Sequence, residues 1–268
     1  MKKIILMLKV ITISVLCSVV MMLLHKVTIL EDIETPQLSW LSNQYGAETA
    51  AFLWGIAAYC VISGVYIVAE KYLKGSKGNR ALLFGGLTGG TWLFGMIEID
   101  QTINNLIMGL VDGVMVVVVC ILIAMLVIPK HEIVDKPDVA RDNYKSGIIE
   151  VGIVATIFAI YRLCFGVFLG KYYDSTFDYI MIPIYSSFMG FMWIKLKNMA
   201  GSGTCFKKAF QYSAIIWGMP SCIFMYFLAF LFANMFVGMT IRNIFDIVFM
   251  TLSVWLAMKF NLTQKMKN

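Results

Sequence analysis

The sequence predicts an all-α, polytopic transmembrane helix bundle, and two observations lead to this prediction. Apolar residues make up 60% of the 268 residues and charged residues only 14%, whereas a globular domain carries roughly a quarter charged residues. The apolar residues gather in runs of about 20, the length with which an α-helix crosses the hydrocarbon core, without the alternation of a barrel strand. Lipid therefore replaces water around most of the predicted surface.

About eight runs are long enough to span. We place them at 4–24, 48–69, 81–97, 106–128, 148–169, 179–199, 212–234 and 238–258. The third is short and crosses only if it stands upright. Because only Asn234 to Gly238 separates the last two, the alternative topology has seven spans with one long broken helix there.

Residues 1–268 are expected to form a single integral membrane domain that reads as four out-and-back hairpins. A degenerate repeat of a two-helix unit explains this pattern, and chance resemblance between apolar helices is the alternative. The first run begins like a signal peptide, with Lys2 and Lys3 before apolar residues. No small-x-small cleavage site follows Met21–Leu24, so we expect a retained helix.

Charge alternates in sign between successive gaps. If the N-terminus is inside, 18 of the 22 Lys and Arg residues fall on the inner side, and the outer gaps carry mainly Glu and Asp. The positive-inside rule therefore predicts that both termini are cytoplasmic. The net charge of +6 then reflects an inner face that meets anionic membrane lipid, and nucleic acid is not an expected partner.

Neither cysteine nor histidine indicates a metal or cofactor. The six cysteines contain no CxxC pair, and His25 and His131 are predicted at opposite faces of the membrane. Two ligands so far apart cannot share an ion. We therefore expect no metal, no cofactor and no disulfide.

Glycine patterns predict close helix packing. Gly85/Gly89 and Gly86/Gly90 are overlapping small-xxx-small pairs in the third span, and the fourth contains Gly109 and Gly113. Since no hydrophobic force joins helices inside lipid, close backbone approach is what holds them together. The third and fourth spans should therefore pack tightly.

Four ionisable residues fall inside predicted spans, in the outer half of the membrane: Asp112, Arg162, Arg242 and Asp246. A lone charge at this depth costs several kcal/mol, and the cost falls if acid meets base or if the groups face water. The expected pairs are Arg162 with Asp112 and Arg242 with Asp246, or the crossed arrangement. These residues form either a structural ionic clasp or the floor of an outward-facing cavity that binds a solute or proton.

Other polar and irregular features have simpler interpretations. Glu150, Lys195 and Lys197 lie near predicted inner ends, where long side chains reach the headgroups. Pro220 should kink the seventh span. The loop His25–Ala47 contains Trp40 and nearby apolar residues, which predict a short interfacial helix or a lid, with a helix resting on the membrane favoured.

These observations favour a transporter- or permease-like protein whose ligand-binding residues for a small solute or ion are Asp112, Arg162, Arg242 and Asp246. The alternative is a non-catalytic membrane subunit, such as the permease part of an ATP-driven exporter or an immunity protein. That alternative needs an inner loop, Pro129–Gly147 or Gly201–Gln211, to dock a cytoplasmic ATPase or another membrane subunit. No GxGD, GxSxG or Walker motif is present, so an enzyme ranks last. We expect a multi-pass protein of the bacterial cytoplasmic membrane.

Overall fold

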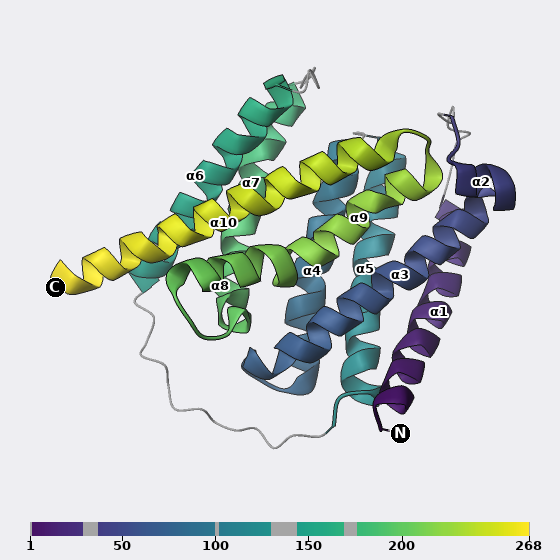
Figure 1. Cartoon of the computed structure of the whole chain (residues 1–268), viewed down its shortest axis with the longest axis horizontal. Helices are drawn as coiled ribbons and strands as arrows, with labels where there is room; N and C mark the ends of the chain where they lie inside the picture. Colours follow the sequence, from purple (N-terminus) through teal and green to yellow (C-terminus); the bar gives the residue numbers. More distant parts are fainter. Residues whose placement is uncertain (1, 29–36, 100–101, 130–143, 169–175, 268) are drawn as a thin grey trace. The chain divides into compact units, whose positions relative to one another are not determined.

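The computed structural model describes residues 2–28, 37–99, 102–129, 144–168 and 176–267, which are helical nearly throughout (Figure 1). Within these ranges the structure contains no strand and a single isolated bridge between Leu38 and Phe232. The all-α prediction is confirmed. Seven helical segments of the described chain are long and apolar enough to cross a membrane, which fits a polytopic membrane protein.

The chain divides into two compact units. Unit 1 comprises Met1–Glu132 and Trp217–Ile244, and unit 2 comprises Ile133–Ile216 and Phe245–Asn268. Helix α10, Met235–Lys267, begins in unit 1 and continues into unit 2. The expectation of one membrane domain over 1–268 stays a prediction.

Unit 1 is built from four long helices and several shorter elements. These are α1 (Lys2–Thr28), α2 (Trp40–Tyr45), α3 (Ala47–Ala69), the 3-10 turn η1 (Glu70–Tyr72), α4 (Lys77–Ile99), α5 (Ile103–Leu126) and α9 (Gly218–Leu231), with the start of α10. Every predicted span of this unit falls on a helix. Helix α4 is not among the seven segments with sufficient hydropathy; it contains six glycines.

Contacts at the helix ends show that the long helices of unit 1 alternate in direction. At one end, Lys9 of α1 donates a hydrogen bond to the Leu126 carbonyl of α5 (3.1 Å), and Lys77 of α4 donates to the Ile128 carbonyl. At the other end, Lys26 of α1 pairs with Glu48 at the start of α3 (3.1 Å). The alternating sign of charge in the gaps between the apolar runs predicts this alternation of helix direction. Which end is cytoplasmic stays a prediction.

Residues 212–258 do not form one long broken helix. Asn234, with φ of 62°, lies in the turn between α9 and α10. Across this turn, Tyr226 and Thr240 share a hydrogen bond of 2.9 Å, and the ring of Tyr226 stacks on Phe236. The two helices therefore pack back on each other as a hairpin. The total number of spans stays a prediction.

Helices α4 and α5 pack through their glycines, as the sequence predicts. A Cβ atom at Gly113 would lie 2.9 Å from the Gly89 carbonyl oxygen, and one at Gly89 would meet the Gly113 carbonyl. A Cβ at Gly85 would lie 2.9 Å from Cα of Val117. Gly86 differs, since a Cβ atom there would meet nothing within 4 Å. The face of α4 that contains Gly85 and Gly89 therefore makes the close approach to α5.

An aromatic cluster joins α3, α4 and α9 in the core of unit 1. Trp54 and Trp92 are almost fully buried, and their ring centroids lie 5.5 Å apart. The indole of Trp54 donates to the Ile223 carbonyl (2.7 Å), and that of Trp92 donates to the Pro220 carbonyl (3.1 Å). Pro220 follows a π-helical turn, η3 (Tyr212–Ile216), so the regular helix is interrupted where the proline predicts a kink.

The first predicted loop contains the expected short helix, α2. Ser39 caps it by accepting a hydrogen bond from the Ser42 amide (3.0 Å), and its own hydroxyl donates to the Phe230 carbonyl at the end of α9. The side chain of Trp40 is 73% exposed. Helix α2 is therefore tied to α9 and leaves an aromatic side chain facing outward. Residues 29–36 of this loop lie outside the described residues.

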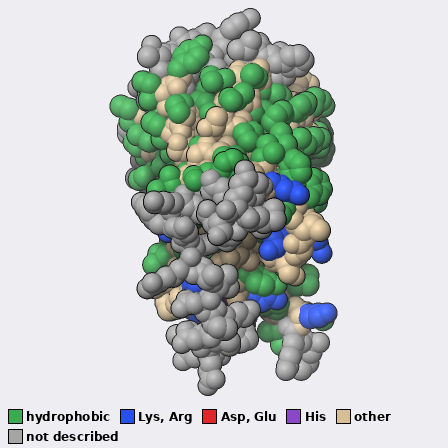
Figure 2. All heavy atoms as spheres, turned by 90° about the vertical axis from the view of Figure 1, so that its left-hand side faces the viewer, with side chains coloured by type: hydrophobic (Ala, Val, Ile, Leu, Met, Phe, Trp, Pro, Cys, Tyr) green, Lys and Arg blue, Asp and Glu red, His purple; other side chains and the backbone are tan. Residues whose placement is uncertain are grey.

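Unit 2 consists of α6 (Tyr144–Phe168), α7 (Thr176–Leu196), the 3-10 turn η2 (Lys197–Ala200), α8 (Cys205–Gln211), η3 and most of α10. Helices α6 and α7 pack closely. A Cβ at Gly190 would have no room, since it would lie 2.6 Å from the Val151 carbonyl oxygen. In the face shown in Figure 2, hydrophobic side chains cover the upper part and the visible Lys and Arg side chains lie lower. Of the predicted inner loop Pro129–Gly147, residues 130–143 lie outside the described residues.

Candidate functional site

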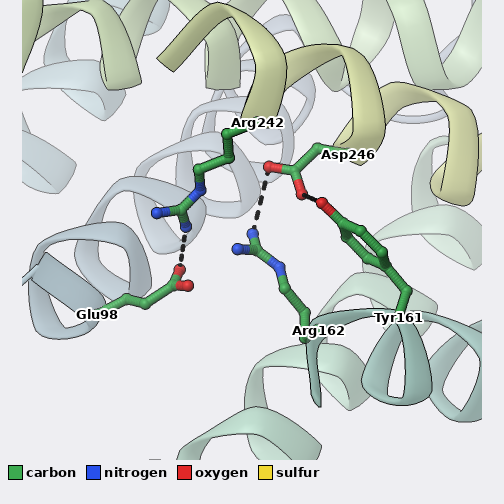
Figure 3. A network of polar contacts seen from close by, with 5 residues as sticks. All are labelled: Glu98, Tyr161, Arg162, Arg242 and Asp246. Carbon is green, nitrogen blue, oxygen red and sulfur yellow. Dashed lines mark hydrogen bonds and ion pairs between the residues drawn. The ribbon is translucent and has the colours of Figure 1, made fainter. Parts of the chain in front are cut away.

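A buried ion pair lies in unit 2 between α6 and α10. Arg162 is 5% exposed and Asp246 is 6% exposed. The guanidinium Nη2 lies 3.4 Å from Oδ2 of Asp246, and the Tyr161 hydroxyl donates a hydrogen bond of 2.6 Å to Oδ1 of the same carboxylate (Figure 3). Asp246 therefore receives a short hydrogen bond from a neutral donor and a longer contact from a cation.

Aromatic rings surround the Arg162 guanidinium. Its Cζ atom lies 5.2 Å from the ring centroid of Phe158, 5.5 Å from Tyr185 and 5.9 Å from Tyr161. The negative faces of aromatic rings stabilise a cation most strongly where water is excluded. Arg162 thus keeps a favourable environment that does not depend entirely on Asp246.

Two further polar contacts lie in unit 1, each with one of the predicted residues. Asp112 of α5, which is 4% exposed, lies 3.0 Å from Nε2 of His25 at the end of α1. Arg242 at the start of α10 lies 2.7 Å from Oε2 of Glu98 at the end of α4 (Figure 3). Both pairs lie at the end of unit 1 where α1 and α4 finish.

The predicted pairings are met in part. Arg162 pairs with Asp246, which belongs to the crossed arrangement. Arg242 pairs with Glu98 and Asp112 with His25, and sequence reasoning named neither partner. Glu98 and His25 were missed because they lie at span ends, where polar residues are ordinary. The only available signal was that both fall on the predicted outer side with Asp112 and Arg242.

Glu150 is buried in unit 2, so the expectation that it reaches the headgroups is wrong. Only 3% of this residue is exposed. The Trp193 indole donates to its Oε2 atom (2.9 Å), Asn261 donates to Oε1, and Lys197 lies 3.6 Å from Oε1. Two hydrogen-bond donors, from α7 and α10, and a nearby cation in η2 stabilise the carboxylate, which makes burial tolerable. Lys195 is exposed, and its contact with the headgroups stays a prediction.

A second buried carboxylate that sequence reasoning missed is Glu70, in the turn after α3. It is 4% exposed and lies 3.1 Å from Nη1 of Arg80 in the first turn of α4. The two residues close the short connection between α3 and α4. The signal available in the sequence was the spacing of Glu70 from Tyr59, Ser63 and Tyr66, which places all four on one helical face.

Each unit therefore contains buried charged side chains that can bind an ion or a charged solute. Within the described residues, no three His, Cys, Asp or Glu side chains gather as metal ligands would. Chemically, the clusters offer guanidinium groups for an anion and carboxylates for a cation or proton. The fold and these clusters fit the class of polytopic α-helical membrane proteins. Comparison of the chain with protein families, characterised proteins and solved structures finds no match.

Proposed function

We propose that this protein is a transporter- or permease-like protein of the cytoplasmic membrane that moves a small solute or an ion. The residues proposed to bind it within unit 1 are Asp112 and Arg242, and those proposed to bind it within unit 2 are Arg162 and Asp246. Ionisable residues within apolar helices are rare and most often belong to substrate or ion pathways. All four carry buried or largely buried side chains.

The contact between Arg162 and Asp246 is the observation that carries this proposal. A well-formed pair between a guanidinium and a carboxylate has an N–O distance of about 2.7–2.9 Å, and here it is 3.4 Å. Tyr161 holds the carboxylate by a shorter bond, and three rings stabilise the cation. In the proposed role, Arg162 binds a negative group of a solute while the three rings continue to stabilise its charge.

A binding experiment on purified protein tests this role of Arg162. The thermal unfolding midpoint, Tm, is measured in detergent with chloride, phosphate, acetate, glutamate and cationic solutes. A ligand at 100 times its dissociation constant stabilises the folded state by about 2.7 kcal/mol. We expect at least one anionic solute to raise Tm in the wild type, and Arg162→Ala to abolish that rise.

Lys195→Ala is the matched control, because Lys195 belongs to the same unit but is exposed. It should keep the full ligand-induced rise in Tm. If every rise survives in Arg162→Ala, the guanidinium does not bind the solute and the proposed role of Arg162 is wrong.

Asp112→Asn provides a second test, this time of transport. The substitution keeps the shape of the side chain but removes the carboxylate that contacts Nε2 of His25. We expect solute flux into proteoliposomes to be lost while the amount of protein in the membrane is unchanged. Glu48→Gln is the control, since Glu48 pairs with Lys26 at an exposed position, and it should transport normally. Normal flux in Asp112→Asn would contradict the proposal.

The alternative, a membrane subunit of a larger assembly, is favoured by one feature of α8. Phe206 and Phe210 are 59% and 50% exposed and lie one turn apart, next to Lys207, in the predicted inner loop Gly201–Gln211. Such a face suits a protein partner. Stoichiometric co-purification of a cytoplasmic ATPase that is lost in Phe206→Ser/Phe210→Ser would establish this alternative, and co-purification unaffected by the double substitution would place the partner elsewhere.

A further inference from the structure

A row of buried hydroxyl groups runs along one face of α3 in unit 1, and the proposed function does not use it. Tyr59, Ser63 and Tyr66 follow one another at spacings of four and three residues, which places them on one side of the helix. All three are 0% exposed. Within the described part of the chain, none of their hydroxyl groups has a hydrogen-bond partner.

Helix α4 faces this row with Phe84, Thr88 and Trp92, which lie on one side of that helix. Tyr59 stacks on Trp92 with ring centroids 6.4 Å apart, and Tyr66 stacks on Phe84 at 5.4 Å. Thr88 lies one helical turn from each of these α4 residues and is 1% exposed. Among the residues that the structure describes, its hydroxyl also lacks a hydrogen-bond partner. The middle of this face of α4 is therefore polar and lies between two pairs of stacked rings.

We define the hydroxyl row as Tyr59, Ser63, Tyr66 and Thr88. A buried hydroxyl that makes no hydrogen bond destabilises the folded state, so such groups in native proteins are normally satisfied by protein or by internal water. A buried water typically makes about three hydrogen bonds to polar groups of this kind. The four hydroxyls of the row are the groups to which such water would bond.

A buried carboxylate lies toward each end of the hydroxyl row. Glu70 follows Tyr66 by four positions on the same helical face. Asp112 is buried in α5, which packs against α3, and its charge acts on the Tyr59 hydroxyl. Glu70 follows Tyr59 by 11 positions along the chain, which is about 16 Å along a helix axis. The row therefore connects two carboxylates over roughly half of a hydrocarbon core of about 30 Å.

We propose that the hydroxyl row binds a file of water molecules and carries protons between Asp112 and Glu70. A proton is accepted at one carboxylate, O–H bonds are exchanged along the waters and hydroxyls, and a proton is released from the other carboxylate. Only O–H bonds form and break, and no oxidant or reductant is needed. The other titratable or charged groups beside the two ends are His25, Cys17, Arg80 and Cys120. This inference shares Asp112 with the proposed function but does not depend on the solute proposed above.

Proton flux through the purified full-length chain in liposomes tests the proposal. The liposomes enclose a pH-sensitive dye, and a potassium gradient with valinomycin drives protons inward. We expect wild-type liposomes to acidify faster than protein-free liposomes. Tyr66→Phe, which keeps the stacked ring and removes the hydroxyl, should slow the flux about tenfold, as an added barrier equivalent to one lost hydrogen bond would.

Tyr72→Phe is the matched control, because Tyr72 follows the same helix but is 37% exposed. It should conduct at the wild-type rate. Thr88→Val removes a second hydroxyl of the row from the facing helix and should also slow the flux if Tyr66→Phe does not fold. Wild-type flux equal to that of protein-free liposomes, or flux unchanged in both variants, would overturn the proposal.

The unfolding midpoint of the same variants gives a second measurement that does not require flux. If the row is dry, removal of an unpaired hydroxyl removes a penalty and Tyr66→Phe raises Tm. If water occupies the row, the variant takes a partner from that water and lowers Tm. We expect Tm to fall in Tyr66→Phe and in Thr88→Val, and a rise in both would mean that the row holds no water.

Discussion

At the scale of single residues, the buried charges are tolerated because each has an opposite charge or several donors beside it. Arg162 and Asp246 show this in unit 2, where both are almost fully buried and in contact. Removal of one partner from such a pair leaves an uncompensated charge, which usually costs more than the pair contributes. Stability measurements can therefore separate the value of the pair from the cost of isolating one charge.

A double-mutant cycle measures the coupling between Arg162 and Asp246. Arg162→Met should lower the free energy of unfolding in mixed micelles by about 3–5 kcal/mol, because Asp246 is left buried and charged. The double variant Arg162→Met/Asp246→Asn should be more stable than the sum of the single changes predicts, by at least about 1 kcal/mol.

The exposed pair of Lys26 and Glu48 is the control cycle. Its side chains are 57% and 71% exposed, so the coupling energy there should be about 0–1 kcal/mol. Equal coupling energies in the two cycles would show that burial does not strengthen the Arg162–Asp246 pair.

At the scale of the elements, packing inside each unit depends on positions where a side chain has no room. Gly89 of α4 meets the backbone of Gly113 of α5, and Gly190 of α7 meets the backbone of Val151 of α6. Backbone cannot move aside as a flexible side chain can. These contacts therefore set the distance between neighbouring helices, which in turn decides which polar side chains can meet.

Gly89→Ala should destabilise unit 1, because its new Cβ would overlap the Gly113 carbonyl. Overpacking of this kind typically costs about 1–3 kcal/mol. Gly86→Ala, in the same helix with nothing within 4 Å, should be neutral or stabilising by up to about 1 kcal/mol through helix propensity. The measurement is the free energy of unfolding of both variants. A larger loss in Gly86→Ala than in Gly89→Ala would contradict the packing of α4 on α5.

At the scale of the whole molecule, the ends of the helices in unit 1 follow the alternation that charge predicts. Lys9 and Lys77 lie at one end, beside the last carbonyls of α5, and His25 and Glu98 lie at the other end. Basic side chains also stabilise the carbonyls at a helix C-terminus. Retention of positive charge on the cytoplasmic side would place the Lys9 end inside.

Cysteine labelling in intact cells tests this orientation. In a variant without the six native cysteines, single cysteines at positions 33 and 175 should react with a membrane-impermeant reagent added from outside. A cysteine at position 76 should react only after the cells are opened. The reverse pattern would invert the topology, and reaction at 33 but not at 175 would change the number of spans between them.

The sequence by itself determined the helical membrane class, the approximate place of the long helices and the glycine contact of α4 with α5, but it did not predict α8. These properties follow from local composition, because lipid requires every backbone group to be satisfied within its own helix. The irregular joint near Pro220 and the short helix α2 were predictable for the same reason, since proline and amphipathic spacing act locally.

Only the tertiary structure decided which charges meet. His25 lies 87 positions from Asp112, and Arg162 lies 84 positions from Asp246. Hydropathy places such residues at a depth in the membrane but does not say which faces of two helices touch. The burial of Glu150 and Glu70 and the partner of Arg242 depend on that rotation of each helix, and packing against neighbouring side chains sets it.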